Sequence, residues 1–181
     1  MTEAEKTDSE AALIAAAQAH LRSGSLLRAM EAYYKAHELN PASVQTLAQL
    51  VAINLHLEAY DQAIVNLQKL IRLEPLVQVN YDQLAGVYDR VQEWDQAAEI
   101  YKPLIIGRPE LAEAHFNHAY YLRRAGQFEE AIAGYKRAIK HGIKSPEEAH
   151  LNIAVILSDD LRREDEAEKA LTQALDHGID P

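Results

Sequence analysis

Apolar residues recur through most of the chain at the spacing of an amphipathic helix. Leu47, Leu50, Val51 and Asn54 fall at i, i+3, i+4 and i+7 and form one stripe. A second stripe of helical spacing follows at Tyr60, Ala63, Leu67 and Leu70. Only the short link 58–59 separates the two segments, so the two predicted helices must pack antiparallel.

This helix–turn–helix pattern recurs with a period of 34 residues. A small residue marks the period at Ala29, Ala63, Ala97 and Ala131, and Ala167 follows 36 residues later. A large residue stands three positions earlier, at Leu26, Tyr60, Trp94 and Phe128. A third column, four positions after each alanine, contains Tyr33, Leu67, Tyr101, Tyr135 and Leu171. The alanines predict where two helix axes approach closely, because a larger side chain would push the axes apart.

A 34-residue helix–turn–helix unit with these columns resembles the tetratricopeptide repeat (TPR). The third unit matches the family pattern most fully, at Tyr81, Leu84, Ala85, Tyr88, Trp94, Ala97, Tyr101, Leu104 and Pro109. The resemblance implies an all-α fold, a right-handed superhelical solenoid of about five antiparallel helix pairs. We place the repeats at about 10–43, 44–77, 78–111, 112–146 and 147–181, after a flexible acidic N-terminal segment, 1–9.

Three features depart from the regular repeat. Pro103 lies inside the predicted second helix of the third repeat and should kink that helix near Glu99, because proline lacks a backbone N–H. The fifth repeat contains one extra residue near Asp159–Asp160. Imidazoles occupy packing columns of the fourth and fifth repeats, at His115, His118 and His150.

Composition and charge narrow the possible partners. The chain of 181 residues contains no Cys, which excludes a disulfide scaffold, a thiolate metal site and a cysteine nucleophile. The formal net charge of -10 argues against nucleic acid or an anionic membrane as the main partner, since both require a basic surface. No apolar run approaches the ~20 residues of a transmembrane helix, and the N-terminus is acidic where a secretory signal would be basic. We therefore expect a soluble, cytoplasmic protein.

When antiparallel pairs stack, their first helices line a concave face, and equivalent positions form columns along it. One of these, the amide column, contains Gln49, Gln83, Asn117 and Asn152. A primary amide can donate to a carbonyl and accept from an N–H of the same extended peptide, so this column suits a peptide of unspecified sequence. It resembles the peptide-binding asparagine ladder in the TPR arm of O-linked N-acetylglucosamine transferase. Alternatively, the amides bond to neighbouring helices and fix the stacking.

A second column on the same face, the cationic column, contains Arg22, His56, Arg90 and Arg124. These side chains could attract the carboxylates of an acidic peptide. They could equally be helix-end cations, which the helix dipole favours in a last turn. Phe116 and Tyr120 lie on the same predicted face, where we expect them to supply apolar contact with a ligand.

One ligand class can be set aside on family resemblance. TPR proteins that bind chaperone tails use a carboxylate clamp of Lys and Asn at defined groove positions. The corresponding columns of this chain contain no Lys and consist of Ile14, Gln18, Gln49, Val79 and Gln83. We do not expect this chain to bind such a tail.

The sequence contains no recognisable catalytic or cofactor motif. A glycine-rich phosphate loop, a G-x-S-x-G elbow and an H-E-x-x-H pattern are all absent. His115 and His118 could chelate a metal, but no carboxylate in the repeat register completes a site. We therefore predict no metal, no cofactor and no catalytic residue.

The leading hypothesis is a non-catalytic protein–protein interaction scaffold that binds a peptide or partner segment in the concave groove. Two alternatives remain open. Residues 141–168 resemble the TPR region of bacterial proteins that continue into a sulfotransferase domain, which would make the chain the arm of a larger enzyme. The last repeat keeps Leu171, Ala174 and Leu175 on repeat-like columns, which indicates either a fragment of a longer protein or self-assembly through that repeat.

Overall fold

The computed structural model describes residues 2–178, and every regular element in that range is a helix. The all-α prediction is therefore confirmed for the described residues. The chain divides into two compact units, residues 1–80 and 81–181. No helix among the described residues is both long enough and apolar enough to cross a membrane.

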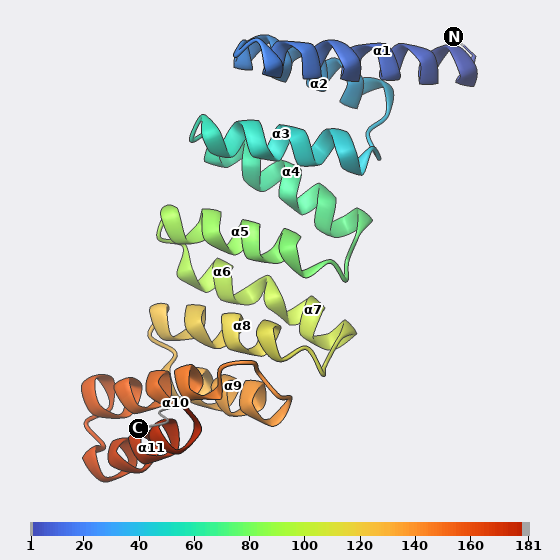
Figure 1. Ribbon diagram of the computed structural model, residues 1–181. Coiled ribbons are helices and arrows are strands. Elements are labelled where there is room, and N and C mark those ends of the chain that lie inside the picture. Colours follow the sequence, from blue (N-terminus) through green and yellow to red (C-terminus); the bar gives the residue numbers. More distant parts are fainter. Residues whose placement is uncertain (1, 179–181) are drawn as a thin grey trace. The chain divides into compact units, whose positions relative to one another are not determined.

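Unit 1 is built from two helical hairpins. α1 (Glu3–Arg22) packs against α2 (Leu26–Leu39), and α3 (Val44–His56) packs against α4 (Tyr60–Leu73) (Figure 1). α2 also contacts α3, which joins the two hairpins. One core cluster of this unit contains Ala17, Ala29, Ala32, Tyr33, Leu50 and Ile53.

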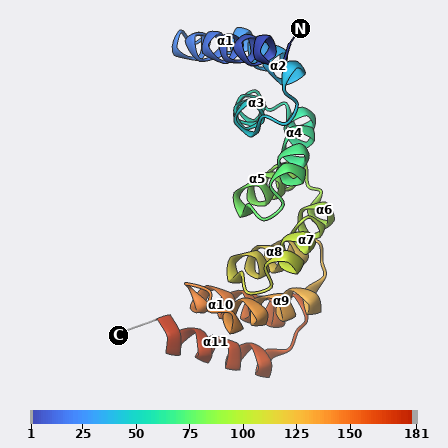
Figure 2. The same cartoon turned by 90° about the vertical axis from the view of Figure 1, so that its right-hand side faces the viewer.

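Unit 2 contains most of α5 (Gln78–Arg90) and all the elements that follow it. These are α6 (Trp94–Glu99), α7 (Tyr101–Gly107), α8 (Ala112–Arg124), α9 (Phe128–Lys140), α10 (Pro146–Val155), the π-helix η1 (Ile156–Asp160) and α11 (Glu164–Gly178). α9 packs against both α8 and α10, and α11 packs against α10 (Figure 2).

Two irregularities expected in unit 2 have a local cause. The helix that contains Pro103 is interrupted at Ile100, between α6 and α7, as predicted, because Pro103 offers no N–H to the carbonyl of Glu99. The extra residue of the fifth repeat lies in η1, where a π-helix takes up one residue through i→i+5 hydrogen bonds. One such bond runs from the N–H of Leu161 to the carbonyl of Ile156, at 3.0 Å.

The N-terminal segment differs from the expectation. We expected residues 1–9 to be flexible, but α1 begins at Glu3, so residues 3–9 form its first turns. Thr2 and Glu5 form a capping box, in which the Thr2 hydroxyl accepts from the Glu5 N–H at 3.3 Å and the Glu5 carboxylate accepts from the Thr2 N–H at 2.7 Å. Glu3 and Glu5, in the first turn of α1, also stabilise the positive end of the helix dipole.

The hairpin turns follow the same period as the helices. Gly24, Glu58, Gln92 and Gly126, spaced by 34 residues, have φ values of 74°, 55°, 62° and 78°. Glycine adopts this left-handed conformation without strain, whereas Glu58 and Gln92 adopt it at some cost because of their Cβ atoms. The backbone of the turn therefore repeats even where the residue type does not.

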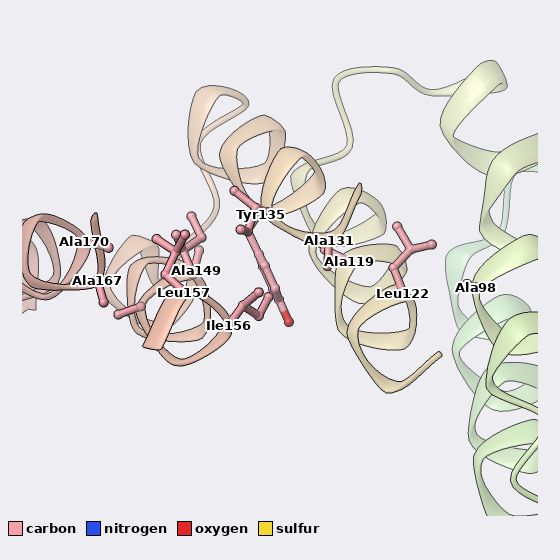
Figure 3. Close-up of a cluster of buried hydrophobic side chains, with 13 residues drawn as sticks. Ala98, Ala119, Leu122, Ala131, Tyr135, Ala149, Ile156, Leu157, Ala167 and Ala170 are labelled. Atoms are coloured by element: carbon pink, nitrogen blue, oxygen red, sulfur yellow. The ribbon is translucent and has the colours of Figure 1, made fainter. Parts of the chain in front are cut away.

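The column of alanines is buried, as its role in helix packing requires. Ala29, Ala63, Ala97 and Ala131 are 0% exposed, and Ala167 is 3% exposed. In the core of unit 2, Ala131 lies near Ala119 and Tyr135 points toward Ile156 (Figure 3). The period seen in the sequence therefore follows the points of close packing.

The tightest glycine contact occurs between α8 and α9. A Cβ on Gly134 would lie 2.8 Å from the Cβ of Ala119, a distance at which one of the two helices would have to shift. Gly86, in the interior of α5, is the opposite case, because a Cβ there would meet no atom within 4 Å.

We expect Gly134→Ala to lower the free energy of unfolding by about 1–3 kcal/mol, because overpacking outweighs the better helix propensity of alanine. The matched substitution Gly86→Ala should raise the free energy of unfolding by about 0.5–1 kcal/mol, since its methyl group has room. Urea denaturation of both variants measures the difference. Equal stabilisation by the two substitutions would contradict the close α8–α9 contact.

Candidate functional site

Six of the seven predicted site residues of unit 2 lie on α5 and α8, which two polar interactions join, and the seventh, Asn152, lies on α10. We call the surface of α5 and α8 the α5–α8 face. Its members on α5 are Asp82, Gln83, Gly86, Asp89 and Arg90, and its members on α8 are Phe116, Asn117, Tyr120, Tyr121 and Arg124. Two polar bridges join the helices, and the sequence assigned no role to either of the carboxylates involved, Asp82 and Asp89.

The first bridge, the Asp82 bridge, joins α5, α7 and α8. Asp82 Oδ1 accepts from Asn117 Nδ2 at 2.9 Å and from the Tyr101 hydroxyl at 2.7 Å. Burial, reinforced by the Asp82 carboxylate, raises the pKa of Tyr101, so this hydroxyl remains a donor. The Tyr101 ring stacks on Tyr121, with centroids 6.2 Å apart. The Asn117 amide therefore forms an intramolecular hydrogen bond, which holds the Asp82 carboxylate in position.

The second bridge, the Asp89 bridge, holds Arg124. Asp89 Oδ1 accepts from Trp94 Nε1 at 3.1 Å and lies 3.3 Å from Arg124 Nη2. The guanidinium carbon is 4.9 Å from the centroid of the Trp94 ring, and Arg124 Nη1 donates to the Tyr120 hydroxyl at 3.1 Å. We expected Arg124 to be available to an acidic ligand, but its guanidinium already has an internal carboxylate partner.

The carboxylates of both bridges act on the pKa of Tyr121. Burial, together with the charges of Asp89 and Asp82, raises the pKa of Tyr121 to about 12. Tyr120 packs edge-on against Tyr121, with centroids 5.0 Å apart, and remains 37% exposed. An exposed ring held by a hydroxyl bond and an aromatic contact is a rigid surface for a ligand.

The four residues of the amide column differ in their hydrogen-bond partners and in their exposure. Asn117 bonds to a neighbouring helix, whereas Asn152 Nδ2 donates to the Glu148 carbonyl of its own helix at 2.9 Å. Gln83 is exposed and Gln49, in unit 1, is half-buried. Neither glutamine side chain forms a hydrogen bond with the described residues. The structural alternative thus holds for Asn117, while Gln83 keeps its amide available.

The remaining predicted residues also differ in their surroundings. Phe116 is half-buried and packs edge-on against Tyr135 at 5.1 Å between centroids, which makes it partly a core residue. The four members of the cationic column lie in the last turns of α1, α3, α5 and α8, where the helix dipole favours them. Arg90 is exposed, and no carboxylate of the described residues lies within ion-pair distance of it.

The buried histidines serve packing. His115 exposes 4% and His118 exposes 8% of its surface. His115 Nε2 lies 2.8 Å from the Pro109 carbonyl, so that nitrogen donates, and its ring stacks on His141. Among the residues that the structure describes, no cluster of three or more His, Cys, Asp or Glu side chains could hold a metal ion.

A pocket lies elsewhere in unit 2, away from the α5–α8 face. Its volume is about 430 Å³, and it is bounded by α9, α10, η1 and α11. Its lining includes Ile139, Ile153, Leu157, Lys136, Glu166 and Lys169. These groups mix apolar surface with charges of both signs, and none of them belongs to the columns predicted to bind a ligand.

Comparison with known proteins agrees with the repeat pattern. A family model described as tetratricopeptide repeat matches residues 83–146 and 116–181, which together exceed half of the chain. A crystal structure of MamA protein is 21% identical with a TM-score of 0.73, covering 94% of this chain and 92% of that chain. MamA from Desulfovibrio magneticus RS-1, residue 41 to the end, is 16% identical with a TM-score of 0.69, covering 93% and 94%.

A third similar structure is YrrB, described as a TPR protein with an unusual peptide-binding site. It is 21% identical with a TM-score of 0.68, covering 93% of this chain and 86% of that chain. At these identities the likeness establishes the fold, and it confirms the predicted TPR-type arrangement of helix pairs. No curated protein matches the chain.

We expect Asn117→Ala to lower the free energy of unfolding by about 1 kcal/mol, because it removes a cross-helix donor to Asp82. In an Asp82→Ala background the same substitution should have little further effect, which gives a coupling energy of about 1 kcal/mol. A double-mutant cycle by chemical denaturation measures this coupling. Asn152→Ala serves as the control and should change stability less, since that amide bonds within its own helix. If the two substitutions changed the free energy of unfolding additively, the hydrogen bond between Asp82 and Asn117 would contribute no stability.

Burial of His118 predicts that the stability of the fold depends on pH. Burial lowers the pKa of His118 to about 4, with Lys102 adding to the effect, against about 6.5 in the unfolded chain. Between about pH 4 and pH 6.5 this imidazole is protonated in the unfolded chain and neutral in the folded chain. Its contribution to the free energy of unfolding is therefore fully present above about pH 6.5 and is lost as the pH falls toward 4. At pH 4.5 this single group should destabilise the fold by about 2 kcal/mol.

His118→Phe should remove that part of the pH profile and leave the contribution of the carboxylates. Urea denaturation of both proteins at pH 7 and pH 4.5 measures the difference. Parallel profiles for the two proteins would contradict a buried, neutral His118.

Proposed function

The chain belongs to the tetratricopeptide repeat family, and we propose that it is a non-catalytic scaffold that binds an extended peptide or partner segment across the first helices of its repeats. Four side chains of the α5–α8 face are exposed: Gln83, Arg90, Tyr120 and Arg124. Arg124 is paired with Asp89, so the other three remain able to contact a ligand. Tyr120 carries the proposal, because its half-exposed ring is held rigidly by Arg124 and Tyr121. Rigid aromatic side chains of this kind dominate binding energy at protein interfaces.

The other predicted residues either offer groups to the ligand or hold the face in place. Gln83 and Asn152 offer amide groups to a peptide main chain, and Asn152 keeps an N–H and its carbonyl oxygen after bonding to Glu148. Asn117 and Arg124 position Asp82 and Asp89, and Phe116 supports the face from the core. Gln49 offers an equivalent amide on unit 1.

A preference for acidic ligands depends on Arg90 in this proposal. Arg124 is paired with Asp89, so an acidic side chain of the ligand would have to compete with that carboxylate. The peptide-binding site of YrrB supports the general class of function, since YrrB shares this fold. The cytoplasmic location expected from the sequence, and a role as the arm of a larger enzyme, stay predictions that a fusion localisation experiment and the downstream coding sequence can test.

We expect Tyr120→Ala to weaken peptide binding by about tenfold or more, because it removes the exposed anchor of the face. Peptides selected from a random display library on the intact chain supply the ligands, and fluorescence anisotropy measures their Kd. Tyr120→Phe keeps the ring and should retain most of the affinity.

Ile106→Ala, which truncates an 81% exposed side chain on α7, is the control outside the face and should leave binding unchanged. Failure to select any peptide, or equal affinity of Tyr120→Ala and the unsubstituted chain, would reject the proposal. A sedimentation coefficient that rises with protein concentration in the unsubstituted chain, but not in Leu175→Ser, would favour self-assembly instead.

A further inference from the structure

We propose that the main chain of an acidic partner peptide crosses α5 at Gly86, between the side chains of Gln83 and Arg90, an inference that rests on the proposed function. These three residues occupy positions i, i+3 and i+7 of α5 and therefore share one stripe of the helix. We call them the open stripe.

Gly86 has no explanation within the fold. Glycine in a helix interior is less stabilising than alanine, so its presence usually reflects a close contact. Gly134 has such a contact, at 2.8 Å from Ala119 for an added Cβ, but Gly86 has none within 4 Å. The space that a side chain would fill over Gly86 is open, and a ligand there can reach the helix backbone itself.

The two neighbours of Gly86 on the open stripe carry complementary ligand-binding groups. Gln83 presents an amide that forms no hydrogen bond with the described residues, and one peptide unit can satisfy both its donor and its acceptor. Arg90 presents a guanidinium with no ion-pair partner in the described part of the chain, which selects a carboxylate. The stripe thus binds a main chain at one end and an acidic side chain at the other.

The bridges between α5 and α8 keep this stripe in place. Asp82 and Asp89, four residues before and three residues after Gly86, are tied to Asn117 and Arg124 of α8. The Asp89 bridge also satisfies Arg124, which leaves Arg90 as the arginine of the face with a free guanidinium. Tyr120 lies on α8 between Asn117 and Arg124 and is 37% exposed.

The test uses library-selected peptides and, for each, a version in which Asp and Glu are replaced by Asn and Gln. Gly86→Ala should raise the Tm by about 2 °C and yet weaken binding of the acidic peptides by about tenfold. Arg90→Gln should weaken acidic peptides by about fivefold and leave their amide versions unchanged. Arg137→Gln, an exposed arginine of α9 outside the face, is the charge-matched control and should change neither.

The outcomes separate this inference from the proposed function. If Tyr120→Ala abolishes binding while Gly86→Ala binds as well as the unsubstituted chain, the peptide binds the face but does not cross at Gly86, and the inference is overturned. Equal losses of acidic and amide peptides on Arg90→Gln would overturn the acidic specificity. If no peptide is selected, the proposed function and this inference fail together.

Discussion

Close approach of helix axes at small side chains is the constraint on which the rest of this structure depends. A buried alanine recurs at each hairpin, and Gly134 permits the α8–α9 contact in which an extra methyl group would lie 2.8 Å from Ala119. These contacts decide which stripe of every helix turns toward its neighbours. They thereby also decide which stripe stays exposed, so the packing of the repeat determines the surface available to a partner.

Polar bridges then divide the exposed face into fixed and available groups. Asp82 and Asp89 each hold a side chain of α8, and the second of them occupies Arg124, which by residue type alone would be a binding group. A carboxylate–guanidinium pair that is about one-third exposed adds little stability. In the proposed function its larger effect is on recognition, because it leaves Arg90 and Tyr120 as the groups that a ligand would engage without breaking an internal ion pair.

Sequence periodicity was sufficient for the helices and for two of their irregularities. The alanine column located the buried contacts, Pro103 located the interruption at Ile100, and the extra residue near Asp159 located η1. The start of α1 was not predicted, because the Thr2–Glu5 capping box that begins the helix was not recognised.

The pairing of site residues was not predictable from the columns. Equivalent residues are 34 apart, but the bridges join residues 35 apart, Asp82 to Asn117 and Asp89 to Arg124. A column therefore identifies residues in like positions and does not identify their partners on the next helix. The same limit explains why four amides in one column have different surroundings: Asn117 is bonded across helices, Asn152 within its own helix, and Gln83 is exposed.

The most direct test is a crystal structure of the intact chain bound to a selected peptide. We expect an extended peptide over α5 and α8, with its main chain within van der Waals distance of Gly86 and hydrogen-bonded to Gln83. A peptide seated instead in the pocket between α9, α10 and α11 would contradict it.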